Sequence, residues 1–150
     1  MKGRTYRYFQ GKPLYPFGYG LSYTTFSYSS LTGAENEVAA GSPVTFEVTV
    51  TNTGQRAGDE VAQLYLNFPD VKGAPLRALQ GFERVHLDAG ASQKVRFQLQ
   101  PRDLSMVTEA GDIIVAGGKY TVSVGGGQPD AGVPVLTKVF DVKGNMNLPE

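Results

Sequence analysis

Residues 43–54, with the sequence PVTFEVTVTNTG, indicate the fold class more clearly than any other stretch of this chain. Apolar residues alternate with polar ones along it: Val44, Phe46, Val48 and Val50 against Thr45, Glu47, Thr49 and Thr51. Successive side chains of a strand point to opposite faces, so this alternation predicts a strand with one face in a core. Asn52, Thr53 and Gly54 then supply the chemistry of a turn.

Comparable segments recur on the C-terminal side of this strand. They are DEVAQLYLNFP at 59–69, QGFERVHL at 80–87, QKVRFQLQ at 93–100, KYTVSVGGG at 119–127 and VLTKVFDV at 135–142. With a first strand near residues 26–31, they predict an all-β sandwich of about seven strands, with the glycine-rich loop 125–129 between the last two. The residues expected in the core are Phe46, Val48, Leu64, Leu66, Phe97, Leu99, Tyr120, Val122 and Phe140, with Leu136 and Val142 also facing inward.

Composition narrows the possible partners. The 150 residues carry 14 Lys plus Arg and 14 Asp plus Glu, and they form no basic stripe, which argues against a nucleic-acid partner. The absence of cysteine excludes disulfides and thiolate metal sites. No apolar run approaches the ~18 residues of a membrane span, so we expect no membrane partner. The first ten residues, MKGRTYRYFQ, do not resemble a signal peptide, because no apolar stretch follows them.

The acidic residues and the histidine do not suggest a catalytic centre. A glycosidase needs two carboxyl groups facing one bond, whereas Asp59 and Glu60 are adjacent in a predicted strand and so point to opposite faces. His86, the only histidine, is expected to be a surface strand residue. We therefore predict no catalytic residue and no cofactor.

Metal and phosphate sites are also not indicated. One histidine and no cysteine make a zinc site improbable, and Asp70, Asp112 and Asp130 lack the spacing of calcium ligands. The stretch VGGGQP at 124–129 is not followed by the Lys-Ser/Thr pair or the helix of a phosphate loop. We predict a hairpin connection there and no metal site.

The stretch YPFGYGLSYTTF at 15–26 combines many rings with a flexible backbone. Its aromatic residues are Tyr15, Phe17, Tyr19, Tyr23 and Phe26, and Gly18 and Gly20 flank Tyr19. Such rings either stack on sugars or pack against another protein surface. The absence of tryptophan weakens the case for a sugar-stacking platform, so packing against another domain is the favoured interpretation.

Several motifs resemble the C-terminal fibronectin type III-like domain of glycoside hydrolase family 3, the β-glucosidases and β-xylosidases. They are PLYPFGYGLSYT at 13–24, NTGQRAGDEVAQLYL at 52–66, LQGFERVHLDAG at 79–90, GKYTVSVGG at 118–126 and the ending KGNMNLPE at 143–150. The resemblance implies that this domain follows a (β/α)₈ barrel and an α/β sandwich domain, which carry the catalytic Asp and Glu. Neither family motif has a counterpart here, so no catalytic role transfers to any residue.

The resemblance also implies a division of the chain and a function. Residues 1–24 would be a connector from the α/β sandwich domain, residues 25–144 the fibronectin type III-like domain, and residues 145–150 a tail. The expected role is a non-catalytic accessory domain of an enzyme that hydrolyses terminal β-glucosides or β-xylosides and is periplasmic or secreted. The residues expected to dock on the barrel and the α/β sandwich are Tyr15, Phe17, Gly18, Tyr19, Gly20 and Tyr23. The alternative is a carbohydrate-binding or cell-surface adhesion module, and a weak glycan contact is compatible with either.

Overall fold

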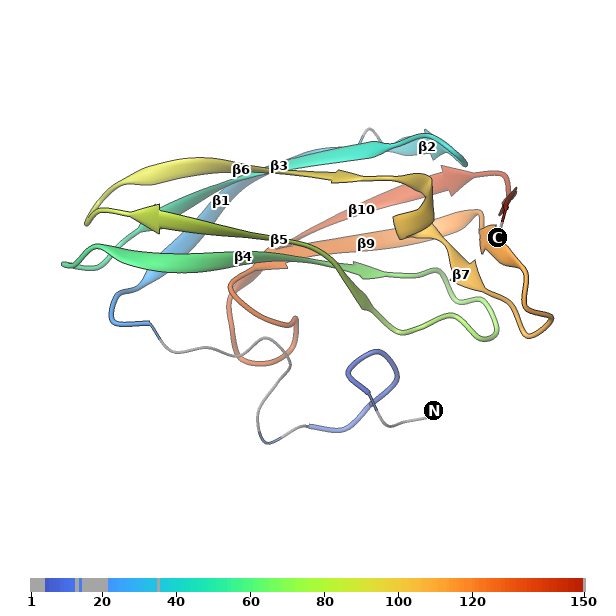
Figure 1. The fold of residues 1–150 in the computed structure, drawn as a ribbon, viewed down its shortest axis with the longest axis horizontal. Coiled ribbons are helices and arrows are strands. Elements are labelled where there is room, and N and C mark those ends of the chain that lie inside the picture. The colour runs from blue at the N-terminus through green and yellow to red at the C-terminus, as the bar shows by residue number, and fades with distance from the viewer. Residues whose placement is uncertain (1–4, 13, 15–21, 35, 150) are drawn as a thin grey trace.

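The structure is a computed structural model that describes residues 5–12, 14, 22–34 and 36–149. In this part of the chain two main β-sheets pack face to face (Figure 1). The first contains β1 (Phe26–Gly33), β3 (Val44–Asn52) and β6 (Ser92–Leu99), in the order β1-β3-β6. The second contains β2 (Glu37–Ala39), β10 (Val135–Lys143), β9 (Gly118–Gly125), β4 (Gly58–Asn67) and β5 (Ala78–Leu87), in that order.

A third, smaller sheet lies at one end of the sandwich. It contains β11 (Met146–Leu148), β8 (Ile113–Val115) and β7 (Met106–Val107), and a 3₁₀ helix, η1 (Pro101–Leu104), precedes it. β11 falls in the segment predicted as a tail, where it pairs antiparallel with β8. β2 pairs parallel with β10, whereas the other strand pairs of the described chain are antiparallel.

The alternating apolar residues of β3 form part of the core of the molecule. Val44, Phe46 and Val48 pair in register with Leu99, Phe97 and Val95 of β6, so the apolar sets of both strands face the same way. They pack against the inner face of the second sheet in one continuous core. All nine predicted core residues are buried, which confirms the registers assigned to β3, β4, β6, β9 and β10.

The described chain contains more strands than the sequence predicts. Seven long strands match the seven predicted segments: β1, β3, β4, β5, β6, β9 and β10. The additional strands of the described chain, β2, β7, β8 and β11, have three residues or fewer, too few to show a periodic pattern. Leu136, expected inward, is only half-buried at the start of β10.

Among the residues that the structure describes, no helix has both the length and the apolar character needed to cross a membrane.

Candidate interdomain docking surface

The N-terminal segment, of which the structure describes residues 5–12, 14 and 22–25, is attached to the sandwich near its own start. The Tyr6 ring meets the Tyr65 ring edge-on, with 6.3 Å between centroids. The Tyr6 hydroxyl accepts a hydrogen bond from Leu79 N at 3.1 Å, and Arg7 O accepts one from Leu76 N at 2.8 Å. The segment therefore packs on the outer side of the five-stranded sheet, at the end of β4 and the beginning of β5, where Figure 1 shows it.

The same segment is attached a second time, just before β1. Thr24 Oγ1 donates to Asn52 Oδ1 at 2.8 Å, and Thr53 N donates to Thr25 O at 2.8 Å. Gly54 makes this approach possible, because a Cβ at that position would lie 1.9 Å from Thr24 Oγ1. The sequence predicts Asn52 and Gly54 only as turn residues, because their contact with Thr24 is not a local one.

The residues predicted to dock fall mostly outside what the structure describes. Tyr15, Phe17, Gly18, Tyr19 and Gly20 lie outside the described residues. Tyr23 is described, and its side chain is 96% exposed. Phe9 and Leu14 are also exposed apolar residues of this segment, whereas Phe26 packs against the core. The described part of the segment thus combines fixed ends with apolar side chains that the sandwich leaves uncovered.

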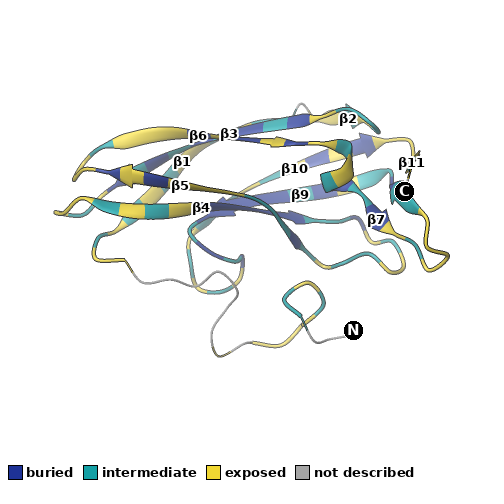
Figure 2. Cartoon of the chain, in the orientation of Figure 1, coloured by how far each residue is buried: buried dark blue, intermediate teal, exposed yellow. Residues whose placement is uncertain are grey.

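The outer face of β4 and β5 carries a second exposed apolar group. Phe82 is 69% exposed and Val61 is 36% exposed. Phe82 pairs with Gln63 and Val61 pairs with Arg84, which places these side chains on the face opposite the core. In Figure 2, exposed positions appear on both strands in this stretch, next to the buried part of β4. The sequence predicts a strand at residues 80–87 but does not indicate that Phe82 is exposed.

A charged cluster borders this apolar group. Asp59 accepts hydrogen bonds from Arg84 and lies 2.5 Å from His86 Nδ1. The hydrogen bond with His86, followed by that with Arg84, holds the pKa of the Asp59 carboxyl below its usual range. The histidine predicted to be a surface strand residue is indeed exposed, and its partner is the acid on the neighbouring strand.

Glu60, the neighbour of Asp59, has a different environment. Burial raises the pKa of the Glu60 carboxyl, and the hydrogen bond from Val61 N opposes this only in part. Burial and, secondarily, the charge of Glu60 raise the pKa of Tyr28 on β1. The two adjacent acids therefore act on different neighbours, as strand alternation predicts, and they do not form a glycosidase pair.

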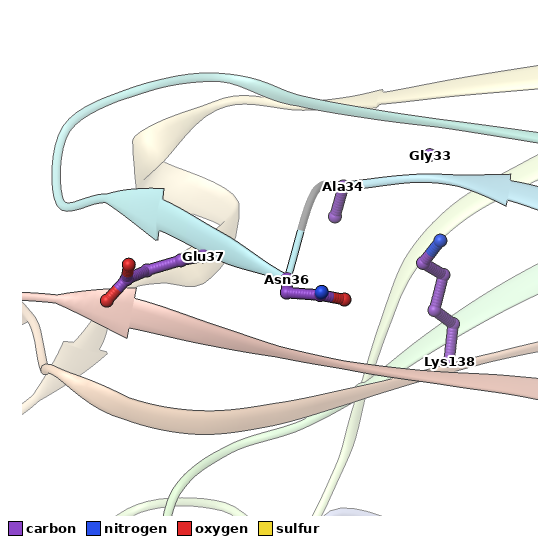
Figure 3. Close-up of a pocket in the computed structure, with 5 residues that line it drawn as sticks. All are labelled: Gly33, Ala34, Asn36, Glu37 and Lys138. Carbon is purple, nitrogen blue, oxygen red and sulfur yellow. The ribbon is translucent and has the colours of Figure 1, made fainter.

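A polar hollow lies beside β2 and β10 (Figure 3). It has a volume of about 730 Å³ and is lined by Gly33, Ala34, Asn36, Glu37 and Lys138. None of these described lining residues is aromatic, so the hollow offers no ring on which a sugar could stack. Within the described residues, no group of three or more His, Cys, Asp or Glu is placed to hold a metal ion.

Comparison with known proteins places these features in a family. A family model described as "Fibronectin type III-like domain" matches residues 60–128, from β4 to the loop after β9. The chain contains this domain. It corresponds to the C-terminal fibronectin type III-like domain of glycoside hydrolase family 3 enzymes, so the resemblance noted in the sequence is confirmed.

The relatives of this fibronectin type III-like domain are much longer than the chain. A "Probable beta-glucosidase D" of Aspergillus flavus is 43% identical over 145 residues, covering 83% of this chain and 19% of that protein. A "Putative beta-xylosidase" of Formosa agariphila is 39% identical over 123 residues, covering 80% of this chain and 16% of that protein. The chain thus spans less than one fifth of the length of these two relatives and corresponds to a non-catalytic part of such enzymes.

Solved structures agree with this placement. β-Glucosidase 3B of Thermotoga neapolitana, determined in complex with α-D-glucose, superposes with a TM-score of 0.84 at 33% identity. The match covers 97% of this chain and 19% of that enzyme. The β-sandwich predicted from alternation is therefore the fold of a domain within a larger glycosidase.

Proposed function

We propose that this domain docks on the catalytic part of a β-glucosidase or β-xylosidase and stabilises it. The observation that carries the proposal is the N-terminal segment, which is fixed to the sandwich at Tyr6 and Thr24 and yet exposes Phe9, Leu14 and Tyr23. Large apolar side chains that a core leaves exposed are typical of a protein–protein contact.

The predicted docking residues extend this surface. Tyr15, Phe17, Gly18, Tyr19, Gly20 and Tyr23 are proposed to contact the (β/α)₈ barrel and the α/β sandwich domain. Each large ring can bury about 150–250 Å², so the four rings of this set would together account for an interdomain contact of about 600–1,000 Å². The connector would thus link the two domains covalently and also form part of the interface between them.

The reaction proposed for the whole enzyme is hydrolysis of a terminal β-linked glucose or xylose. This proposal rests on the names of the relatives, which include both β-glucosidases and β-xylosidases. The catalytic aspartate and glutamate are assigned to the other domains, and the enzyme is proposed to be periplasmic or secreted. No nucleic-acid or membrane partner is proposed.

A second candidate function is a weak contact with the glycan substrate. Phe82 favours it, because a ring exposed on a flat sheet face suits stacking on a sugar. The absence of an aromatic lining in the polar hollow argues for docking instead. Titration of the chain with cello- and xylo-oligosaccharides, followed by amide chemical shifts near Phe82, distinguishes the two functions.

The docking function can be tested by a graft. This chain would replace the segment of Thermotoga neapolitana β-glucosidase 3B that it matches, and the graft would be compared with an enzyme lacking that segment. We expect the graft to restore glucosidase activity and resistance to heat inactivation, whereas the isolated chain shows no activity on chromogenic β-glucosides or β-xylosides. A graft no more active or heat-resistant than the deletion would refute the proposal. So would turnover by the isolated chain that disappears on replacing one Asp or Glu.

A further inference from the structure

We propose that the outer face of β4 and β5 is a second docking contact for the catalytic part of the enzyme. The contact consists of Val61, Phe82 and Arg84, named here the β4–β5 patch. This inference rests on the proposed docking function and adds a surface on the folded sheet to the N-terminal segment.

The backbone pairing fixes the composition of the β4–β5 patch. Val61 pairs with Arg84, and Gln63 pairs with Phe82, so the patch side chains stand next to each other on one face. Gly81 on the preceding position faces the core, where a Cβ would lie 2.8 Å from the Phe97 ring. Phe82 is therefore held outward by the strand and cannot turn into the core.

Neighbouring positions of the same face are already covered. Tyr65 is fully buried and Gln63 is 6% exposed. Tyr6 covers Tyr65, and the Tyr65 hydroxyl donates to Gln63 Oε1 at 2.7 Å. The outer face of β4 and β5 is thus covered at Tyr65 and Gln63 and exposed at the adjoining patch.

The position of the patch indicates its occupant. Tyr6 contacts Tyr65 toward one end of β4, and Thr24 contacts Gly58 at the other, where a Cβ would lie 2.7 Å from Thr24 Cγ2. Val61 lies between these two anchors along β4. Described residues of the N-terminal segment are therefore attached on both sides of the patch, which favours a partner that lies on this face. The proposed occupant is the catalytic part of the same enzyme.

The charges at the β4–β5 patch indicate which partner surface would fit it. Arg84 donates to Asp59 through Nε and Nη2, and its Nη1 has no hydrogen-bond partner within the described residues. Asp59 has both Arg84 and His86 beside it, so the rim of the patch is not acidic. The complementary surface is an apolar recess for the Phe82 ring with a carboxylate or carbonyl oxygen at its edge for Arg84.

The test uses Phe82→Ser in the grafted β-glucosidase and in the isolated chain. Val107→Ser is the matched control, because Val107 is also a largely exposed apolar residue, 60% exposed against 69% for Phe82, on β7 of the small sheet. In the graft we expect Phe82→Ser to accelerate heat inactivation at least fivefold and Val107→Ser to leave the rate unchanged. In the isolated chain, neither substitution should lower the unfolding temperature.

The outcomes separate the inference from the proposed function. A graft that restores heat resistance but responds equally to Phe82→Ser and Val107→Ser upholds the docking function and overturns the patch. A graft that restores nothing overturns both. A loss of stability in the isolated Phe82→Ser chain shows that this chain covers the patch itself, and a loss of oligosaccharide binding in that variant assigns the patch to glycans. Either of these results also overturns the inference.

Discussion

Thr24 and Asn52 are joined by a hydrogen bond of 2.8 Å between Thr24 Oγ1 and Asn52 Oδ1, across 28 positions of sequence. Asn52 is completely buried. Its Oδ1 also accepts from Gly54 N at 3.0 Å, and its Nδ2 donates to Arg56 O at 2.7 Å and Leu87 O at 2.9 Å. One amide group therefore holds the N-terminal segment, the β3–β4 turn and the end of β5 together.

Asn52→Ala should be among the most destabilising polar substitutions in the chain. It leaves the buried carbonyl of Leu87 and the Thr24 hydroxyl without their partner, which predicts a loss of about 2–3 kcal/mol in the free energy of unfolding. Urea denaturation followed by fluorescence measures it. Thr51→Ala, which removes only an exposed hydroxyl contact with Ser92, is the control and should cost under about 0.5 kcal/mol. Equal losses in the two variants would contradict the central role of Asn52.

Gly54→Ala and Thr24→Ala should interact in a double-mutant cycle. Gly54→Ala forces its new methyl group against Thr24 Oγ1, and Thr24→Ala removes that oxygen. We expect the double variant to be more stable than the sum of the two single losses predicts, by about 0.5–1.5 kcal/mol. Strict additivity would mean that Gly54 is required for the turn rather than for the approach of Thr24.

Phe97→Ala tests the register of β6. Phe97 is buried, pairs with Phe46 and lies against Gly81, so truncating it should cost about 3–5 kcal/mol. Arg96→Ala, on the exposed face of the same strand, should change stability by less than about 0.5 kcal/mol. A loss under about 1 kcal/mol for Phe97→Ala would show that the ring is not in the core.

The long strands could be predicted because their chemistry is local. Val44 to Val50 alternate without interruption, and the burial of β3 follows that pattern position by position. The burial in β5 follows no such pattern: Gly81 and Phe82 sit next to a register shift between Leu64 and Tyr65 on its partner strand. A shift of that kind depends on the neighbouring strand, so the exposure of Phe82 could not be derived from residues 80–87 alone.

The contacts of the N-terminal segment could not be predicted from local sequence either. Residues 1–24 have no strand periodicity, and the Tyr6 hydroxyl and the Arg7 carbonyl accept hydrogen bonds from residues some seventy positions later. The exposed ring of Tyr23 could be anticipated from composition, because its glycine- and proline-rich surroundings predict no regular element. The attachment at Tyr6 could not be predicted, because a tyrosine near a chain end gives no indication of which strand it contacts.

Glu60→Gln should stabilise the domain in a pH-dependent manner. Burial raises the folded-state pKa of Glu60, so the wild-type residue favours folding while protonated and loses that contribution as pH rises through its folded pKa. The variant should therefore be the more stable protein at pH 7, and the difference should shrink toward and below the ordinary glutamate pKa of about 4.3. Thermal unfolding at both pH values measures it. A difference that grows as the pH falls would reverse the assigned environment.

Amide exchange can follow the attachment of the N-terminal segment. The Leu79 amide donates to the Tyr6 hydroxyl, and the Leu76 amide donates to Arg7 O. Tyr6→Phe removes the hydroxyl and keeps the ring, so exchange should accelerate about tenfold or more at Leu79 and less at Leu76. The amides of β3 serve as the internal reference and should not change. Unaltered exchange at Leu79 would mean that the segment is not held there by Tyr6.

The parallel pairing of β2 with β10 has a consequence for biosynthesis. Glu37, Val38 and Ala39 pair with Asp141, Val142 and Lys143, which leave the ribosome about one hundred residues after β2. Before β10 emerges, β2 has no strand to join and the apolar strand β9 has an open edge. At translation rates of ~5–20 residues per second, β2 stays without its partner for several seconds. A nascent chain arrested before β10 therefore presents an unfinished sheet, and chaperones that recognise apolar strands would engage this domain late in its translation rather than early.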